Sequence, residues 1–171
     1  MTTERPVQRR LDLRARDGSR LLFIRPMLGM ESVKAILDVS EDDVLDLIAD
    51  GQLRWAWNLR ATGDKAFVRV WGRSVTCYLV PGSQPSEPES MDEVIAALLR
   101  SAGDRQEAIG DGSLRATALQ RLFNVSSGHV LNLLSAGELK LAPRSVCRVG
   151  PGGSPEITRE SVVELLKARS F

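Results

Sequence analysis

One segment of the chain occurs twice, 86 residues apart, and this repeat restricts the possible folds more than any other feature of the sequence. Residues 36–54 (ILDVSEDDVLDLIADGQLR) align without a gap on residues 122–140 (LFNVSSGHVLNLLSAGELK). The two segments share a Val-Ser pair, several apolar positions and a glycine, which are the residues that a common backbone shape needs. We therefore expect one structural unit to be present twice, as copy one (residues 27–80) and copy two (residues 113–171).

Each copy is predicted to begin with two helices joined by a tight turn. In copy two, Leu119, Leu122 and Phe123 form an apolar stripe at helical spacing. Residues 124–126 (Asn-Val-Ser) interrupt this stripe, because asparagine tolerates the left-handed conformation and serine can cap a new helix. Gly137 then ends the second helix. The apolar residues of the two second helices are expected to face inward: Val44, Leu45, Leu47, Ile48, Val130, Leu131, Leu133 and Leu134.

The segment after each glycine is predicted to form a β-hairpin and then a short helix. In copy one the hairpin turns at residues 61–64 and the helix covers residues 73–79; in copy two the ranges are 150–153 and 160–169. A helix-turn-helix followed by a hairpin is the pattern of a winged helix. The predicted fold class is therefore α+β, mainly α, with two tandem winged helix-turn-helix domains that carry small β-hairpin wings.

Residues 114–140 (LRATALQRLFNVSSGHVLNLLSAGELK) resemble the winged-helix DNA-binding domain of the excisionase and MerR-like superfamily. Residues 28–54 are similar, although Asp38 stands at the turn where copy two has Asn124 and the family usually has glycine. The resemblance implies a non-catalytic bacterial, phage or mobile-element protein that binds double-stranded DNA, such as a transcriptional regulator. It does not transfer a target sequence.

The charge of copy one does not suit DNA. In a helix-turn-helix, the exposed N-terminal part of the second helix enters the major groove. Phosphates repel carboxylates there, unless the carboxylate accepts a hydrogen bond from a cytosine amino group. The second helix of copy one carries five acids, of which only those in the first turn are explained by the helix dipole. The candidate protein-contacting residues of this helix are Glu41, Asp42, Asp43 and Asp46.

The second helix of copy two has no acid and is predicted to read the major groove. The candidate base-contacting residues are Ser127, His129 and Asn132. The candidate phosphate-contacting residues are Arg115, Arg121, Lys140, Arg144 and Arg148. Two alternatives stay open: a solvated polar helix without a function, and a protein–protein interaction module that keeps the fold but does not bind DNA through copy one.

Three further segments lie outside the repeat. Residues 1–26 carry seven arginines and are predicted to form a β-hairpin, either as a basic arm on DNA or as an edge hairpin packed on copy one. Residues 81–90 are a linker rich in Pro, Ser and Glu. Residues 91–102 form an amphipathic helix whose apolar face includes Val94 and Leu98. This face is expected to complete the core of copy one or to contact a protein partner, including a second copy of the chain.

Several classes of protein are excluded by what the sequence lacks. It has no glycine-rich phosphate loop, no paired-carboxylate or Ser-His-Asp arrangement, and no metal-ligand cluster around Cys77 or Cys147. We therefore expect neither an enzyme nor a cofactor. The aromatic content of 5% argues against a stacking surface for single strands. No apolar run is long enough to span a membrane, and the N-terminus lacks an apolar signal segment, so a cytoplasmic location is expected.

Overall fold

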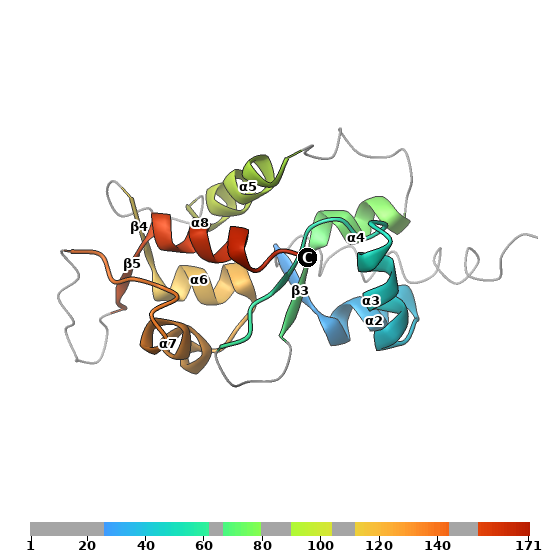
Figure 1. Ribbon diagram of the computed structural model, residues 1–171, viewed down its shortest axis with the longest axis horizontal. Coiled ribbons are helices and arrows are strands. Elements are labelled where there is room, and N and C mark those ends of the chain that lie inside the picture. The colour runs from blue at the N-terminus through green and yellow to red at the C-terminus, as the bar shows by residue number, and fades with distance from the viewer. Residues whose placement is uncertain (1–25, 62–66, 80–89, 104–111, 144–153) are drawn as a thin grey trace, which may run out of the picture.

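The computed structural model describes residues 26–61, 67–79, 90–103, 112–143 and 154–171. In this part of the chain the fold is α+β and mainly helical, with seven helices and two small antiparallel sheets (Figure 1). None of the helices described is long and apolar enough to span a bilayer. Some sequence predictions lie outside the described residues: the N-terminal hairpin up to residue 25, the linker from 81 to 89, both wing tips, Arg144 and Arg148.

Copy one contains three strands and three helices. In chain order they are β1 (Met27–Gly29), α2 (Met30–Leu37), α3 (Glu41–Ala49), β2 (Ala56–Asn58), β3 (Val68–Trp71) and α4 (Gly72–Leu79). The strands form one antiparallel sheet in the order β1-β3-β2. The predicted hairpin is therefore present as β2 and β3, and β1 adds a strand that the sequence analysis did not predict.

Copy two repeats this order of elements with a smaller sheet. A further helix, α5 (Met91–Gly103), precedes copy two. In chain order the elements of copy two are β4 (Ser113–Arg115), α6 (Ala116–Phe123), α7 (Ser127–Ser135), β5 (Glu156–Thr158) and α8 (Arg159–Ala168). Strands β4 and β5 pair in antiparallel fashion, as β1 and β3 do in copy one. The first strand of the predicted hairpin is reduced to a bridge between Leu141 and Ile157 in the described residues.

The backbone confirms the repeat at the turn between the two helices of each copy. Asp38 and Asn124 both adopt the left-handed conformation, with φ of 58° and 53°. This conformation is open to Asp and Asn because their short polar side chains tolerate it. The next helix is capped by Ser40 in α3 and by Ser126 in α7, whose hydroxyl oxygens accept hydrogen bonds from backbone N–H groups. The predicted turn and cap are therefore correct in both copies.

Removing a serine cap should destabilise the chain in either copy. We expect Ser40→Ala and Ser126→Ala each to lower the free energy of unfolding by about 1 kcal/mol, measured by urea denaturation. In α3 the Asp43 carboxylate also accepts hydrogen bonds from the hydroxyl and the backbone N–H of Ser40, which lowers the pKa of Asp43.

The hydrogen bonds that the Asp43 carboxylate accepts from Ser40 should contribute to stability in a pH-dependent way. Because the folded-state pKa is lowered, the contribution is present above the ordinary value of 3.8 and is lost as the pH falls through the lower folded-state pKa. The loss of unfolding free energy caused by Ser40→Ala should therefore become smaller as the pH falls below 3.8, whereas the loss caused by Ser126→Ala should not. Ser135→Ala, in an exposed helical position, is the control. An equal loss for Ser135→Ala would contradict the capping interpretation.

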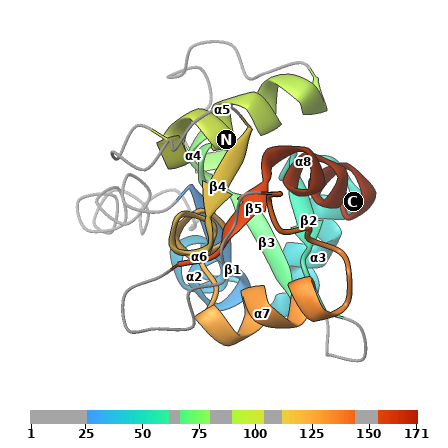
Figure 2. The same cartoon turned by 90° about the vertical axis from the view of Figure 1, so that its left-hand side faces the viewer.

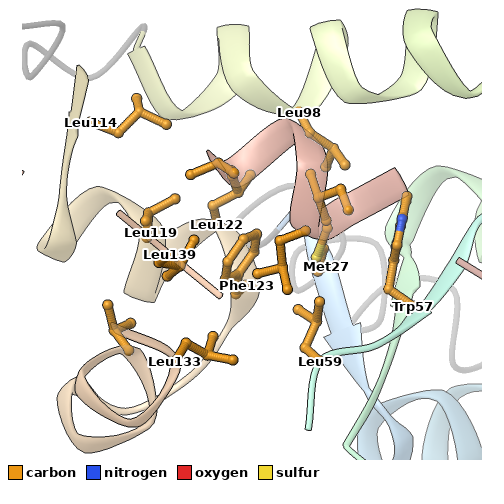
Figure 3. Close-up of a cluster of buried hydrophobic side chains, with 14 of the residues drawn as sticks. Met27, Trp57, Leu59, Leu98, Leu114, Leu119, Leu122, Phe123, Leu133 and Leu139 are labelled. Atoms are coloured by element: carbon orange, nitrogen blue, oxygen red, sulfur yellow. The ribbon is translucent and has the colours of Figure 1, made fainter. Parts of the chain in front are cut away.

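The two copies share a hydrophobic core. One face of the copy-one sheet, with Leu28 and Val70, packs with residues of α2, α3 and α4. Successive side chains of a strand point to opposite faces, and the other face carries Met27, Trp57 and Trp71. These three residues belong to the same buried cluster as the apolar residues of α5, α6, α7 and α8 (Figure 3). The copies are thus packed against each other through the copy-one sheet.

The helix that was expected to complete the core of copy one or to contact a partner is part of this shared core. Val94 and Leu98 of α5 are 0% and 1% exposed, and they lie in one cluster with residues of α6 and α8. Helix α5 therefore completes the core on the copy-two side, and not that of copy one alone. This corrects the expectation that Val94 and Leu98 contact another protein, because the chain itself already covers both side chains.

Candidate nucleic-acid interface

Helix α7 presents one uncharged face to the solvent. The helix is held by Val130 and Leu133, which are fully buried at i, i+3 spacing. The exposed residues of the helix are Ser127, Gly128, Leu131, Asn132 and Ser135. Helix α7 lies on the side of the molecule away from α5 (Figures 1 and 2). Among the predicted base-contacting residues, Ser127 and Asn132 are therefore open to a ligand.

One apolar residue of each second helix was assigned to the wrong side. Leu131 is 53% exposed and the equivalent Leu45 is 37% exposed, although both were expected to face inward. The core takes only one face of each helix, and the residue after Val130 or Val44 is rotated about 100° away from it. Each exposed helix face therefore has a leucine at its centre.

The same face of α3 carries acids at the positions where α7 is neutral. Glu41, Asp42 and Asp46 are exposed, and they stand where α7 has Ser127, Gly128 and Asn132. Asp43 is also exposed and is engaged with Ser40 in the capping box. Helices α3 and α7 lie toward opposite ends of the long axis of the molecule (Figure 1). The equivalent faces of the two helices thus differ in charge: the face of α3 is acidic and the face of α7 is neutral.

His129 faces copy one. Its Nε2 atom lies 2.6 Å from the carbonyl oxygen of Leu59. Since a carbonyl only accepts, this nitrogen carries the proton and donates. Its ring stacks on Phe67 with centroids 4.4 Å apart and an angle of 20° between the planes. The residue is half-buried, so this predicted base-contacting side chain is occupied by contacts within the chain.

Arg69 of β3 makes a second contact between the copies at the same turn, and no sequence argument singled it out. Its Nε donates to the carbonyl of Phe123 at 2.8 Å and its Nη2 to that of Asn124 at 2.9 Å. Burial lowers the pKa of Arg69 to about 10. The described residues form no ion pair with it within 4.0 Å. The only sequence signal was a charged residue between two valines in an apolar strand.

The predicted phosphate-contacting residues lie around α6 and α7. Arg115 is half-buried at the end of β4, where it stands opposite Glu156. Arg121 is exposed in the last turn of α6. Lys140, beyond α7, is exposed and forms an ion pair of 3.4 Å with Glu164. Arg121 is thus the predicted residue that the described part of the chain leaves most open to a phosphate.

No metal site accompanies this surface in the described residues, where no group of three or more His, Cys, Asp or Glu side chains is arranged to hold an ion. The surface is therefore defined by an exposed neutral helix, by basic residues on the neighbouring helix and beyond α7, and by its contacts with copy one. Comparisons of the chain with protein-family models, with curated proteins and with solved structures found no match.

Proposed function

We propose that the protein binds double-stranded DNA without catalysis, as a winged helix-turn-helix protein of the excisionase or MerR-like type. Helix α7 is the helix that enters the major groove. The observation that carries the proposal is the exposed face of α7, which is free of acids although the same face of α3 has them at three equivalent positions. DNA is a polyanion, so the acidic face of α3 repels it and the neutral face of α7 does not.

The exposed residues of α7 suit the edges of bases. Asn132 offers an amide, which can pair with the N6 and N7 atoms of adenine, and Ser127 offers a hydroxyl. Leu131 supplies an apolar contact for the methyl group of thymine. His129 is left out of this set because its ring donates a hydrogen bond to Leu59 and stacks on Phe67. Arg121 and Lys140 contact phosphates in this proposal, together with Arg115 and the wing residues Arg144 and Arg148.

Binding to a labelled duplex of random sequence tests the proposal. Fluorescence anisotropy at about 50 mM salt should show binding that weakens steeply as the salt concentration rises. The reason is that the Lys and Arg side chains that bind phosphates release counterions from the DNA. Arg121→Glu should lower the affinity by about tenfold or more, and Glu160→Gln, on the exposed side of α8, should not. The absence of any binding at low salt would contradict the proposal.

A second candidate function is protein binding through α3. Leu45 is 37% exposed at the centre of a face that also carries Glu41, Asp42 and Asp46. An apolar centre with a charged rim is a common arrangement in protein interfaces, and these charges suit a basic partner. An interaction that is lost with Asp46→Lys and kept with Asn132→Asp would support this function, and one that is kept with both would contradict it.

A further inference from the structure

We propose that Arg69 is a positioning residue, which ties the turn between α6 and α7 to the copy-one sheet and so sets the placement of α7. Copy one then acts as a rigid mount for the helix that reads DNA. The inference rests on the proposed function for the use of α7, but the mechanical link itself is testable without DNA.

The guanidinium group of Arg69 meets the end of α6. Phe123 is the last residue of α6 and Asn124 is its C-cap, so their carbonyl groups lie at the C-terminal end of the helix. The planar fork of arginine presents two N–H groups side by side, and these donate to the two neighbouring carbonyls. A cation at this end also complements the helix dipole. The third nitrogen, Nη1, donates to the carbonyl of Val68 and holds the fork in place.

An aromatic ring joins this contact to the first turn of α7. The Arg69 guanidinium lies 3.7 Å from the centroid of the Phe67 ring. His129 stacks on the same ring and donates to Leu59. Copy one therefore holds both the end of α6 and the start of α7. The two helices that flank the turn cannot shift relative to the copy-one sheet without breaking at least one of these contacts.

The repeat itself indicates that this contact is a special feature of copy one. In copy one, Arg69 stands opposite Gly29 across the β1–β3 pair. In copy two the corresponding cross-strand pair is Arg115 and Glu156. A Cβ atom on Gly29 would lie 3.3 Å from Nη1 of Arg69, so glycine leaves the room that the guanidinium occupies. Both members of the pair thus differ between the copies at the place where copy one reaches copy two.

Such a mount matters because base recognition needs a well-placed helix. Contacts to base edges tolerate displacements of only about 0.5 Å, which requires the supporting residues to be locked by packing and hydrogen bonds. The contacts of Arg69, Phe67 and His129 supply this lock on the side of α7 that faces away from the exposed helix face. Copy one thus contributes to DNA binding without having to touch DNA.

The test compares Arg69→Met, Arg69→Lys and Val75→Ala in the full chain. Val75 is fully buried in the copy-one cluster on the other side of the sheet, so its truncation lowers stability without touching the turn. The first readout is amide hydrogen exchange of residues 124–130, and the second is the affinity for a duplex of random sequence at low salt. Both are measured well below the melting temperature of each variant.

In Arg69→Met we expect the amides of residues 124–130 to exchange at least about tenfold faster, since the buried carbonyl of Phe123 and the part-buried carbonyl of Asn124 lose this donor. The affinity for DNA should fall by about tenfold as well. Arg69→Lys should restore part of both, because an ammonium group can still donate to these carbonyls but lacks the planar fork. Val75→Ala should change neither. If Arg69→Met does not fold, Arg69→Lys carries the same comparison with smaller expected effects.

The positioning role and the proposed function fail in different ways. If Arg69→Met and Arg69→Lys exchange at residues 124–130 as the unmodified chain does, the positioning role is overturned, whatever the affinity for DNA. Equal acceleration in Val75→Ala would overturn it too, since the effect would then follow global stability. If the unmodified chain does not bind DNA but exchange accelerates only in the Arg69 variants, the mechanical link stands and the proposed function fails.

Discussion

Giving α7 the acids of α3 should abolish DNA binding and leave the fold intact. The triple variant Ser127→Glu, Gly128→Asp, Asn132→Asp places three carboxylates where the proposal puts bases and phosphates. Each juxtaposition of like charges at an interface costs several kcal/mol, so the affinity should fall by at least about 100-fold. Fluorescence anisotropy with a random duplex at low salt measures the loss. An affinity equal to that of the unmodified chain would show that α7 is not the helix that binds DNA.

Because of the repeat, this variant should keep the fold. The same three acids already stand at the equivalent positions of α3, on the same backbone. A Cβ atom on Gly128 would meet only the Ser126 hydroxyl, at an ordinary contact distance of 3.8 Å. Acids in the first turn also favour the helix dipole. Circular dichroism and the midpoint of urea unfolding should therefore show a fold at least as stable as the original.

The reverse exchange is the matched control. Glu41→Ser, Asp42→Gly, Asp46→Asn removes the acids of α3 and changes the net charge of the chain by the same amount in the opposite sense. If copy one does not touch DNA, this variant should bind the duplex within about threefold of the original, because only the weak, screened long-range field changes. A gain as large as the loss in the α7 variant would mean that net charge, and not the face of α7, controls binding.

Truncating Trp57 should destabilise both copies together. This residue is 0% exposed in β2 of copy one, yet it belongs to the buried cluster that includes the helices of copy two (Figure 3). Loss of a buried tryptophan side chain costs about 3–5 kcal/mol. Its indole N–H has no acceptor among the described residues, so the loss reports packing and not a broken hydrogen bond. We expect Trp57→Ala to lower the free energy of unfolding, measured by urea denaturation, by this amount.

The unfolding of this variant should remain a single transition. Because one cluster joins the copy-one sheet to α5, α6, α7 and α8, neither copy can unfold without exposing the apolar surface of the other. Far-UV circular dichroism and tryptophan fluorescence should therefore give coincident curves. Leu131→Ala, at a position that is 53% exposed, should cost far less. Two separate transitions, with Trp57→Ala affecting only one, would contradict a shared core.

The local backbone of this protein could be predicted from the sequence. The left-handed residues Asp38 and Asn124 and the caps Ser40 and Ser126 depend on sterics and hydrogen bonds within a few residues of each position. Because such interactions are local, the repeat alone was enough to place both turns. Gly51 and Gly137, at φ of 68° and 73°, follow the same rule.

The surroundings of the second helices could not be predicted in the same way. Leu131 is apolar and yet exposed, because the helix has only one buried face and the sequence does not say how wide that face is. His129 is polar and yet held in the chain, because Leu59 and Phe67 reach it from copy one. The placement of His129 thus depends on residues about 60 to 70 positions away in the chain.

The repeat in the sequence thus determined the turn and the serine cap between the paired helices of each copy, and the residue types of α3 and α7 determined the charge of each exposed helix face. Only the tertiary structure decided that the copies share a core, that Val94 and Leu98 are covered by the chain itself, and that Arg69 reaches the carbonyls of Phe123 and Asn124. The physical reason is that each of these side chains is buried or bonded by a segment that is distant in the sequence. Local sequence specifies the conformation of a segment but not the segment that packs on it.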